Sequence, residues 1–359
     1  MATEVKPLKC VIIGCGRISK KHLEVFKELP DTQLTAVCDI NIERAQKIAR
    51  ELQIEAYQDY HQMMQKEKPD LVSVLTDSGS HAAVVIDIAK YGAHVVVEKP
   101  MALTLQDADK MIWACDEHQV KLFVVKQNRY NLPVQKLKEA LDQGRFGKLV
   151  MGTVRVRWCR TQAYYDQDKW RGTWEHDGGV FANQASHHVD LLEWMMGDVD
   201  TVYAKTATQL VDIETEDTGV AILKFHNGAL GVIEATTATR PKDLEGSISI
   251  LGEKGSVEIG GFAVNEMKIW NFTEPHEGDR DVLENYRENP PSVYGFGHYE
   301  YMKNVVECIR TGKKALVDGL EGRRSLELIN AIYESAETAR EVPLRFTPKK
   351  CRLGRSRQS

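Results

Sequence analysis

The chain has 359 residues, 42% of them hydrophobic and 28% charged, and this length predicts two domains rather than one core. Its formal net charge of −5 gives no electrostatic reason to expect a nucleic-acid partner. The chain also lacks any run of eighteen apolar residues, so we expect no membrane contact and no membrane-spanning helix. Its seven scattered cysteines form no C-x-x-C pair, which favours a reducing cytoplasm over a disulfide-bonded, secreted protein.

The first third of the chain alternates short apolar runs with helical stretches. The expected strands are residues 8–13, 34–38, 71–75, 94–97 and 122–125, and helices such as 42–52 and 82–90 lie between them. Continuous apolar strands that alternate with helices are typical of a parallel sheet covered on both faces. The pattern therefore predicts an α/β, doubly wound N-terminal domain over residues 1–127.

The segment GCGRIS, residues 14–19, directly follows the first expected strand and opens a helix. In a dinucleotide-binding turn the first glycine makes the turn, the second lets the backbone approach a pyrophosphate, and the last position needs a small residue such as Ser19. Asp39 ends the second strand about twenty residues on, where a carboxylate accepts ribose hydroxyls and repels a 2′-phosphate. The motif predicts that NAD binds at Gly14, Gly16, Arg17, Ile18 and Asp39.

Two polar segments follow the third and fourth strands, at the edge where open α/β sheets bind ligands. They are TDSGSH, residues 76–81, and EKP, residues 98–100. A lysine that ends so apolar a strand is expected to face the cofactor cleft, and a cis Lys99-Pro100 bond would turn it inward. The cofactor-binding candidates here are Thr76, Ser78, His81, Glu98 and Lys99.

From about residue 149 the hydrophobic pattern changes to a period of two, which indicates long antiparallel strands. Helices near 187–196, 298–310 and 320–340 are expected to pack on one face of that sheet. Asn227-Gly228 predicts a hairpin turn with positive φ at both positions. We expect an α+β domain with a large, mainly antiparallel sheet at 128–345, serving substrate binding and oligomerisation, and a disordered basic tail at 346–359.

Asn183 and His187 stand four residues apart, so on a helix they share one face, and His188 points about 100° away from it. Adjacent histidines on a helix cannot both face one ion, and the sequence has no H-E-x-x-H spacing, so no metal is expected. The plainer alternative for His187 is a buried histidine with a structural hydrogen bond.

These motifs together resemble the glucose-fructose oxidoreductase / inositol dehydrogenase / MocA family (Gfo/Idh/MocA). The matching segments are GCGRIS, VCDI, EKP, and GG followed by Asn183 and His187, with Asp190 three residues on. The resemblance implies a Rossmann domain, an NAD-dependent oxidation of an alcohol, and Lys99 and His187 as the catalytic pair. The family commonly has an aspartate where this chain has Asn183, and an asparagine cannot take a proton, so an acid–base role there is in question. The remaining cofactor candidates are Asn128, Trp170 and Arg171, although Trp170 and Arg171 could equally form a stacked surface pair.

Longer stretches, such as YYDQDKWRGTWEHDGG and NQASHHVDLLEWMMG, resemble the WlbA-type members of this family, and the similarity runs from about residue 8 to 345. Those enzymes oxidise C3 of UDP-N-acetylglucosaminuronic acid (UDP-GlcNAcA), on the route to diacetylated mannuronic acid in bacterial surface polysaccharide (O-antigen). The resemblance implies a UDP-sugar substrate, 2-oxoglutarate as a hydride acceptor that regenerates NAD⁺, and back-to-back homodimers or homotetramers. The substrate-binding candidates are Lys99, Arg129, Tyr164, Tyr165, Asn183, His187, Tyr294 and His298.

The sequence leaves open whether Lys99 or His187 takes the proton from the reacting hydroxyl, and we favour His187 with Lys99 polarising the oxygen. A UDP-uronic acid carries several negative charges and needs a local basic patch, for which Arg129, Arg155 and Arg157 are candidates. The alternatives are a dehydrogenase of UDP-N-acetylglucosamine, a free sugar or inositol, and a hydrolase that oxidises its substrate transiently with tightly bound NAD. The alternative that is not an enzyme is a non-catalytic scaffold protein that senses NAD.

Overall fold

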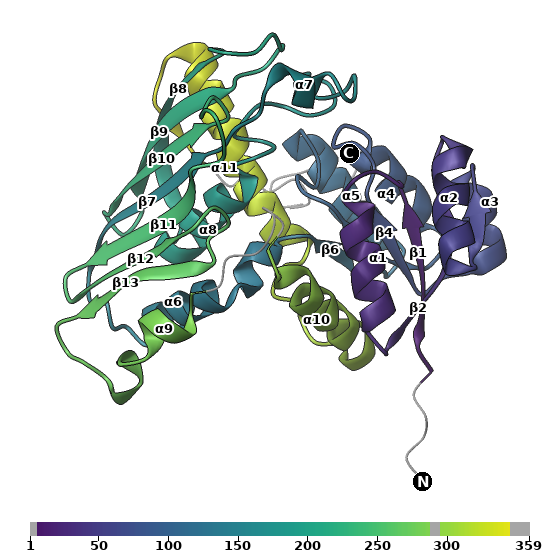
Figure 1. Cartoon of the computed structure of the whole chain (residues 1–359), viewed down its shortest axis with the longest axis horizontal. Helices are drawn as coiled ribbons and strands as arrows, with labels where there is room; N and C mark the ends of the chain where they lie inside the picture. The colour runs from purple at the N-terminus through teal and green to yellow at the C-terminus, as the bar shows by residue number, and fades with distance from the viewer. Residues whose placement is uncertain (1–5, 288–294, 345–359) are drawn as a thin grey trace, which may run out of the picture.

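The structure is a computed structural model that describes residues 6–287 and 295–344. Figure 1 shows two sheets, a parallel one in purple and blue and a mainly antiparallel one in green, with the long helix α11 (Gly319–Thr338) between them. The expected tail at 346–359 and the candidate Tyr294 lie outside the described residues. In the described part of the chain, no helix combines the length and the apolar character that crossing a membrane requires.

Six parallel strands form the first sheet, in the order β3-β2-β1-β4-β5-β6. This order reverses direction between β1 and β4, as in a dinucleotide-binding Rossmann sheet, so the predicted doubly wound fold is confirmed. Of these six strands, the one without a sequence prediction is β3, which is three residues long and lies at the sheet edge. The strands are β1 (Leu8–Ile13), β2 (Thr32–Cys38), β3 (Glu55–Tyr57), β4 (Leu71–Val74), β5 (His94–Val97) and β6 (Leu122–Val124).

Helices cover both faces of this sheet, which explains why its strands are continuously apolar. One apolar cluster joins the sheet to α3, α4 and α5, and a second joins it to α1, α2 and α10. These helices are α1 (Ser19–Glu28), α2 (Ile42–Leu52), α3 (Tyr60–Glu67), α4 (His81–Ala89), α5 (Leu105–Glu117) and α10 (Gly297–Thr311).

Helix α10 corrects one expectation, because it packs on the parallel sheet and not on the antiparallel one. Tyr301, Met302, Val305 and Val306 form its apolar stripe and belong to the same cluster as Ile12. Figure 1 shows α10 beside α1, far along the chain from it. Sequence order suggested the second sheet, but the apolar stripe of α10 is buried in the core on one face of the first sheet.

Eight strands form the second sheet, in the order β13-β12-β11-β7-β10-β9-β8-β14. Among these described strands only the β7–β10 pair is parallel, so the predicted, mainly antiparallel sheet is confirmed. Helices α6, α8 and α11 contribute to the core on one of its faces. The strands are β7 (Leu149–Arg157), β8 (Val199–Ala207), β9 (Thr218–Phe225), β10 (Leu230–Thr236), β11 (Glu245–Gly252), β12 (Gly255–Gly260), β13 (Glu266–Phe272) and β14 (Val342–Pro343). The remaining helices are η1 (Gln127–Tyr130), α6 (Leu132–Asp142), α7 (Gln162–Tyr165), α8 (Ser186–Met196), η2 (Glu277–Asp279) and α9 (Val282–Asn285).

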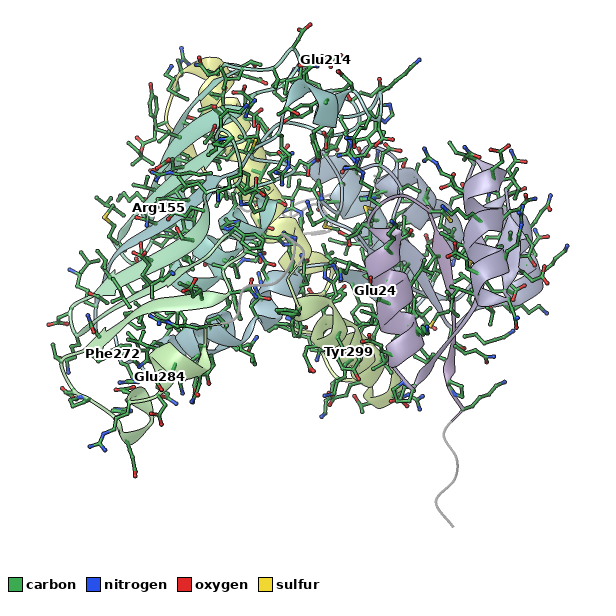
Figure 2. The ribbon with its side chains drawn as sticks, in the orientation of Figure 1. Glu24, Arg155, Glu214, Phe272, Glu284 and Tyr299 are labelled. Atoms are coloured by element: carbon green, nitrogen blue, oxygen red, sulfur yellow. The ribbon has the colours of Figure 1, made fainter. Side chains whose placement is uncertain are left out.

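The outer face of the second sheet carries no helix among the described residues (Figure 1). Arg155, on β7, lies on this face (Figure 2), where its guanidinium pairs with Glu245 at 3.1 Å. Between such ion pairs the face exposes large apolar side chains, which are Tyr203, Val220, Ile222, Leu230, Leu251 and Ile269.

The hairpin between β9 and β10 forms where Asn227-Gly228 predicted it, but with a different turn. Only Gly228 has a positive φ, of 86°, and its N–H donates to the Phe225 carbonyl at 2.9 Å. The Asn227 side chain accepts the Ala229 N–H at 3.0 Å and donates to the Met196 carbonyl at 2.9 Å. The Phe225 N–H donates to the Ala229 carbonyl at 2.9 Å, so the loop between these two paired residues has three residues. The prediction of positive φ at both positions was wrong because it assumed a two-residue turn.

Candidate active site

A cavity of about 1310 Å³ opens between the carboxyl edge of the parallel sheet and the turns that precede α8. Its volume exceeds that of an ordinary single-ligand pocket, which suits a cofactor and a substrate together. Most residues predicted from the sequence motifs line it: Gly14, Gly16, Arg17, Ile18, Asp39, Thr76, Ser78, His81, Glu98, Lys99, Tyr164, Trp170, Arg171, Asn183, His187 and His298.

The turn after β1 has the shape that a pyrophosphate needs. Gly14 has a φ of +100°, and a Cβ there would lie 2.6 Å from the backbone of Leu75, so only glycine fits. A Cβ at Gly16 would meet nothing within 4 Å, which leaves open space beside the backbone. Ser19 is buried, and its hydroxyl donates to the Gly16 carbonyl at 2.7 Å. The residues present therefore fit a dinucleotide at the N-terminus of α1.

Asp39 follows β2 at the rim of the cavity, and backbone groups fix its carboxylate. One oxygen accepts the Cys15 N–H and the other accepts the Asn41 N–H, each at 2.8 Å. The carboxylate still lines the cavity, so its unused lone pairs can accept hydroxyl groups there. Its position suits the ribose hydroxyls of a dinucleotide that starts at Gly14.

Lys99 follows β5, and its side chain reaches across to the second domain. Its Nζ donates to the Asn183 backbone oxygen at 2.8 Å and lies 3.5 Å from Asn183 Oδ1. The Lys99-Pro100 peptide bond is cis. Burial lowers the pKa of Lys99, while the negative charges of Glu98 and Asp177 act in the opposite direction.

His187 stands in the first turn of α8 and lines the cavity, whereas His188 does not. His188 is buried against the ring of Trp158 instead, with the ring centroids 5.8 Å apart. Burial lowers the pKa of His187 well below its ordinary value, and the positive charge of Lys99 lowers it further. His187 is therefore a neutral imidazole at neutral pH.

Asn183 reaches the same cavity without lying on the helix, which corrects the shared-face argument. Helix α8 begins at Ser186, and Asn183 lies in the turns before it, where its N–H donates to the Gly179 carbonyl at 3.0 Å. The Ser186 hydroxyl donates to the Asn183 carbonyl at 3.0 Å. The glycines before Asn183 favour turns over an earlier helix start.

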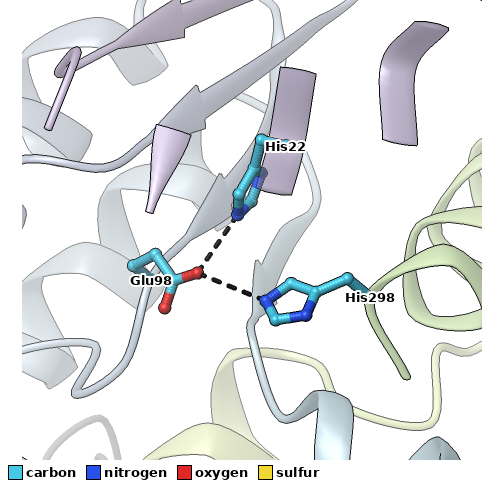
Figure 3. A group of neighbouring side chains, drawn as sticks. All are labelled: His22, Glu98 and His298. Carbon is cyan, nitrogen blue, oxygen red and sulfur yellow. Dashed lines mark hydrogen bonds and ion pairs between the residues drawn. The ribbon is translucent and has the colours of Figure 1, made fainter. Parts of the chain in front are cut away.

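Figure 3 shows a buried group of three side chains, namely His22, His298 and Glu98, the residue that precedes Lys99 in the chain. His22 Nε2 lies 3.1 Å from Glu98 Oε1, a hydrogen-bond distance, and His298 Nε2 lies 4.0 Å from the same oxygen. The three ligand atoms lie within 4.8 Å of one another, and the His22–Glu98 contact is by itself a hydrogen bond. Burial opposes ionisation of Glu98, but the hydrogen bond and charge of His22 and the charges of His298 and Lys99 together lower the pKa of Glu98 to about 2.

Three arginines surround the ring of Tyr164 at the cavity wall. The guanidinium carbons of Arg17, Arg160 and Arg171 lie 5.9, 5.5 and 4.6 Å from its centroid. Arg17 comes from the first domain and the other two from the second, so the group spans both walls. Arg160 pairs with Asp243 at 2.9 Å and Arg171 pairs with Asp168 at 3.1 Å, so the three guanidinium groups stand beside two carboxylates. Guanidinium groups also bind phosphates well, so the group can meet a phosphate in the cavity. Arg160 had no sequence signal, because it belongs to no recognised motif.

Several candidates from the sequence lie away from this cavity. Arg129 is buried and pairs with Asp190, through its Nε at 2.8 Å and its Nη2 at 2.9 Å. Asn128 is buried beside Gln127, and it is Gln127 that lines the cavity. The Tyr165 hydroxyl lies 3.1 Å from Thr237 Oγ1 in the interior. The strand arginines are on the outer face of the second sheet, where Arg155 and Arg157 pair with Glu234, Glu245 and Glu258.

The second-domain wall rests on buried carboxylates that the sequence did not single out. Glu216 accepts the Phe181 N–H and the Tyr333 hydroxyl, each at 3.0 Å, beneath the turns that lead to Asn183. Burial raises the pKa of Glu216 to about 7. Asp177 accepts the Gly172 N–H at 2.8 Å and also accepts a hydrogen bond from the Asn183 side chain. No spacing rule places these acids, because irregular turns bring them together.

Sequence models of two domains match the chain and together span most of it. The NAD-binding Rossmann fold of the oxidoreductase family (Gfo/Idh/MocA) matches residues 8–126, and the C-terminal alpha/beta domain of the same family matches residues 138–344. Among curated proteins, myo-inositol 2-dehydrogenase of Thermotoga maritima is 31% identical over 346 residues, covering 93% of this chain and 97% of that protein.

Two solved structures are similar along nearly the whole chain. The WlbA dehydrogenase from Bordetella pertussis, in complex with NADH and UDP-GlcNAcA, has a TM-score of 0.91 and 45% identity, covering 97% of this chain and all of that one. The WlbA dehydrogenase from Chromobacterium violaceum, in complex with the same two molecules, has a TM-score of 0.90 and 42% identity, covering 96% and 98%.

Proposed function

The chain belongs to the Gfo/Idh/MocA oxidoreductase family, and from that premise we propose that it oxidises the C3 hydroxyl of UDP-GlcNAcA to the 3-keto sugar. It is an NAD-dependent oxidoreductase that acts on a CH–OH group. The choice of substrate rests on one observation, which is the similarity at 42–45% identity to two dehydrogenases bound to NADH and UDP-GlcNAcA. We propose the synthesis of a bacterial surface polysaccharide as the setting of the reaction.

The reaction divides the work between the cofactor and the chain. Bound NAD supplies the acceptor for the hydride that leaves the sugar carbon. The chain must place the sugar, hold its hydroxyl and take the proton from the oxygen. Lys99 and His187 line the same cavity from opposite domains, which suits two groups that contact one hydroxyl.

We assign the base to His187 and the polarising role to Lys99. The Nζ of Lys99 donates to the backbone oxygen of Asn183 and faces its Oδ1, and the negative charges of Glu98 and Asp177 favour its ammonium form. The lowered pKa of His187 keeps its imidazole neutral and able to accept the proton. Asn183 supplies acceptors to Lys99 in this scheme and transfers no proton itself.

The charge of the substrate fits the charges that line the cavity. A UDP-uronic acid brings two phosphates and a carboxylate to a protein whose formal net charge is −5. Arg17, Arg160 and Arg171 line the cavity, and their guanidinium groups can meet the phosphates of such a ligand and of the cofactor.

Comparing two nucleotide sugars tests the proposed substrate. A site built for the C6 carboxylate leaves a donor unpaired when UDP-N-acetylglucosamine binds, because that sugar has a hydroxymethyl group there. We expect kcat/KM to be roughly ten- to a hundredfold higher for UDP-GlcNAcA, followed as NADH absorbance. Equal values for the two sugars would contradict the proposal and favour the neutral sugar.

Product analysis separates the remaining alternatives. The mass of the product should be two hydrogens lower than that of UDP-GlcNAcA, which a hydrolase or a non-catalytic scaffold would not produce. Addition of 2-oxoglutarate tests whether NAD⁺ is regenerated in place, since turnover should then exceed one sugar per bound cofactor. Turnover of myo-inositol in preference to any UDP-sugar would overturn the substrate assignment.

A further inference from the structure

Asp177 is a buried carboxylate that lies behind the cavity wall. Asp177 is 1% exposed and does not line the cavity, so it contacts neither NAD nor the proposed UDP-sugar directly. Its Oδ1 accepts from Asn183 Nδ2, and its Oδ2 accepts the Gly172 N–H at 2.8 Å. One carboxylate thereby holds both Asn183 and the turn that follows Arg171.

The contact with Asp177 determines which way the Asn183 amide faces. An amide side chain has donors at one end and an acceptor at the other, whereas an ionised carboxylate only accepts. The Nδ2 of Asn183 must therefore face Asp177, and its Oδ1 then faces Lys99, 3.5 Å from the Nζ. The flipped amide would set oxygen against oxygen on one side and NH₂ against an ammonium on the other.

We propose that Asp177 is a positioning residue that orients Lys99 through the Asn183 side chain. The inference rests on the proposed function, because it assigns a role relative to the reacting hydroxyl. Asn183 supplies the neutral acceptor next to Lys99, and Asp177 supplies the negative charge one contact further away. A single aspartate at position 183 would have to combine both tasks.

The electrostatics around Lys99 agree with this division. The charged groups that act on Lys99 are Glu98, Asp177, Lys126 and Arg171, and only the two acids favour its ammonium form. Burial raises the pKa of Asp177 to about 6, against the hydrogen bonds from Gly172 and Asn183 and the charges of Arg171 and Lys99. Asp177 is therefore ionised in the slightly alkaline range, where it can order the Asn183 amide.

An exchange of the two residues gives the sharpest test. Asp177→Asn loses either the Gly172 or the Asn183 contact, and we expect kcat to fall roughly ten- to a hundredfold from misplacement of Lys99. Asn183→Asp alone sets two carboxylates side by side and should be at least as poor. The double variant D177N/N183D keeps every contact, since the amide introduced at position 177 can accept from Gly172 and donate to the carboxylate introduced at position 183. Its kcat should recover to within about fivefold of the unmodified protein, a coupling that a double-mutant cycle quantifies.

A second readout needs no substrate. The pH dependence of Lys99 acylation by acetic anhydride, followed by peptide mass, reports the titration of this amine directly. Removing the charge in Asp177→Asn should move that titration to lower pH, and the double variant should move it to higher pH, because its carboxylate is nearer. The matched control is Asp217→Asn, which removes another buried carboxylate that accepts backbone N–H groups of Gln209 and Leu210.

The two readouts keep the inference separate from the proposed function. If the unmodified chain oxidises no UDP-sugar, the proposed substrate fails, but the Lys99 titration still tests Asp177. Unchanged Lys99 titration in Asp177→Asn, or a double variant no better than the product of its single variants, would overturn the inference. A shift of equal size in Asp217→Asn would also overturn it, because the effect would then be one of general stability.

Discussion

The two walls of the cavity are built in different ways. On the first-domain side, the ends of parallel strands carry Gly14, Asp39 and Lys99. Gly14 and Asp39 directly follow β1 and β2, and Lys99 is the second residue after β5. On the second-domain side, Asn183 and Arg171 sit in turns that have no repeating hydrogen-bond pattern and rest on buried Asp177 and Glu216. Regular elements let one wall be read from local sequence, whereas the other depends on side chains that meet only after folding.

The largest expected effect tests whether the two walls contribute equally to the chemistry. Lys99→Ala and His187→Ala each remove one proposed contact to the reacting hydroxyl, so each should lower kcat roughly a hundredfold or more. NAD affinity, measured by calorimetry, should stay nearly unchanged. His188→Ala is the control, since His188 is fully buried outside the cavity and its loss should lower stability rather than kcat. A large kcat effect at His188 with a mild one at His187 would refute the assignment.

The choice between NAD and NADP should depend only on the first-domain wall of the cavity. We expect NAD to bind at least about tenfold tighter than NADP, because the Asp39 carboxylate would lie next to the 2′-phosphate. Asp39→Ala should narrow that gap in calorimetric titrations. Asp59→Ala, which removes an exposed carboxylate that caps α3, should leave the ratio as it was. Equal affinities for the two cofactors in the unmodified chain would argue against Asp39 as the selective group.

The sequence predicts the first wall well because strand ends and glycines leave local signals. Gly14 needs a positive φ, and Asp39 stands at a fixed interval after it, so both could be identified from the chain alone. Arg129 shows the limit of such reasoning. A conspicuous arginine near the boundary suggested an anion contact, but Asp190, sixty-one residues away, holds it in a buried pair. Long-range pairing of this kind has no local pattern.

Glu216, the buried acid beneath the second-domain wall of the cavity, should make the stability of the protein depend on pH. The folded-state pKa of Glu216, about 7, lies above the ordinary value of 4.5, so its contribution to stability is greatest below pH 4.5 and declines as the pH rises towards 7. At pH 8 the folded protein must keep a buried, ionised carboxylate at position 216, which lowers its stability. Glu216→Gln removes this charge and should raise the free energy of unfolding at pH 8 by about 1–3 kcal/mol. At pH 4 the two proteins should unfold alike in thermal scans. The exposed Glu139→Gln should give no gain at pH 8, and a loss at pH 8 in Glu216→Gln would contradict the expectation.

The smallest change concerns assembly, through the helix-free face of the second sheet. Exposed apolar area of this kind is typical of a subunit interface, so we expect a homodimer or homotetramer in solution. Ile222→Lys, in the middle of that face, should shift light-scattering mass towards the monomer at micromolar concentration. Leu210→Lys, which changes an exposed residue in a loop outside the face, is the control. A monomeric unmodified chain would remove the interface from consideration.

The return of α10 to the parallel sheet has a consequence for how the chain is made. During synthesis the residues up to 127 leave the ribosome first, yet Tyr301, Met302, Val305 and Val306 fill one of the two apolar clusters of that domain. A nascent chain halted before residue 297 therefore carries an uncovered hydrophobic face, a species that invites aggregation or chaperone binding. By the same reasoning, the excised segment 1–127 should be poorly soluble, and adding α10 as a separate peptide should improve its recovery.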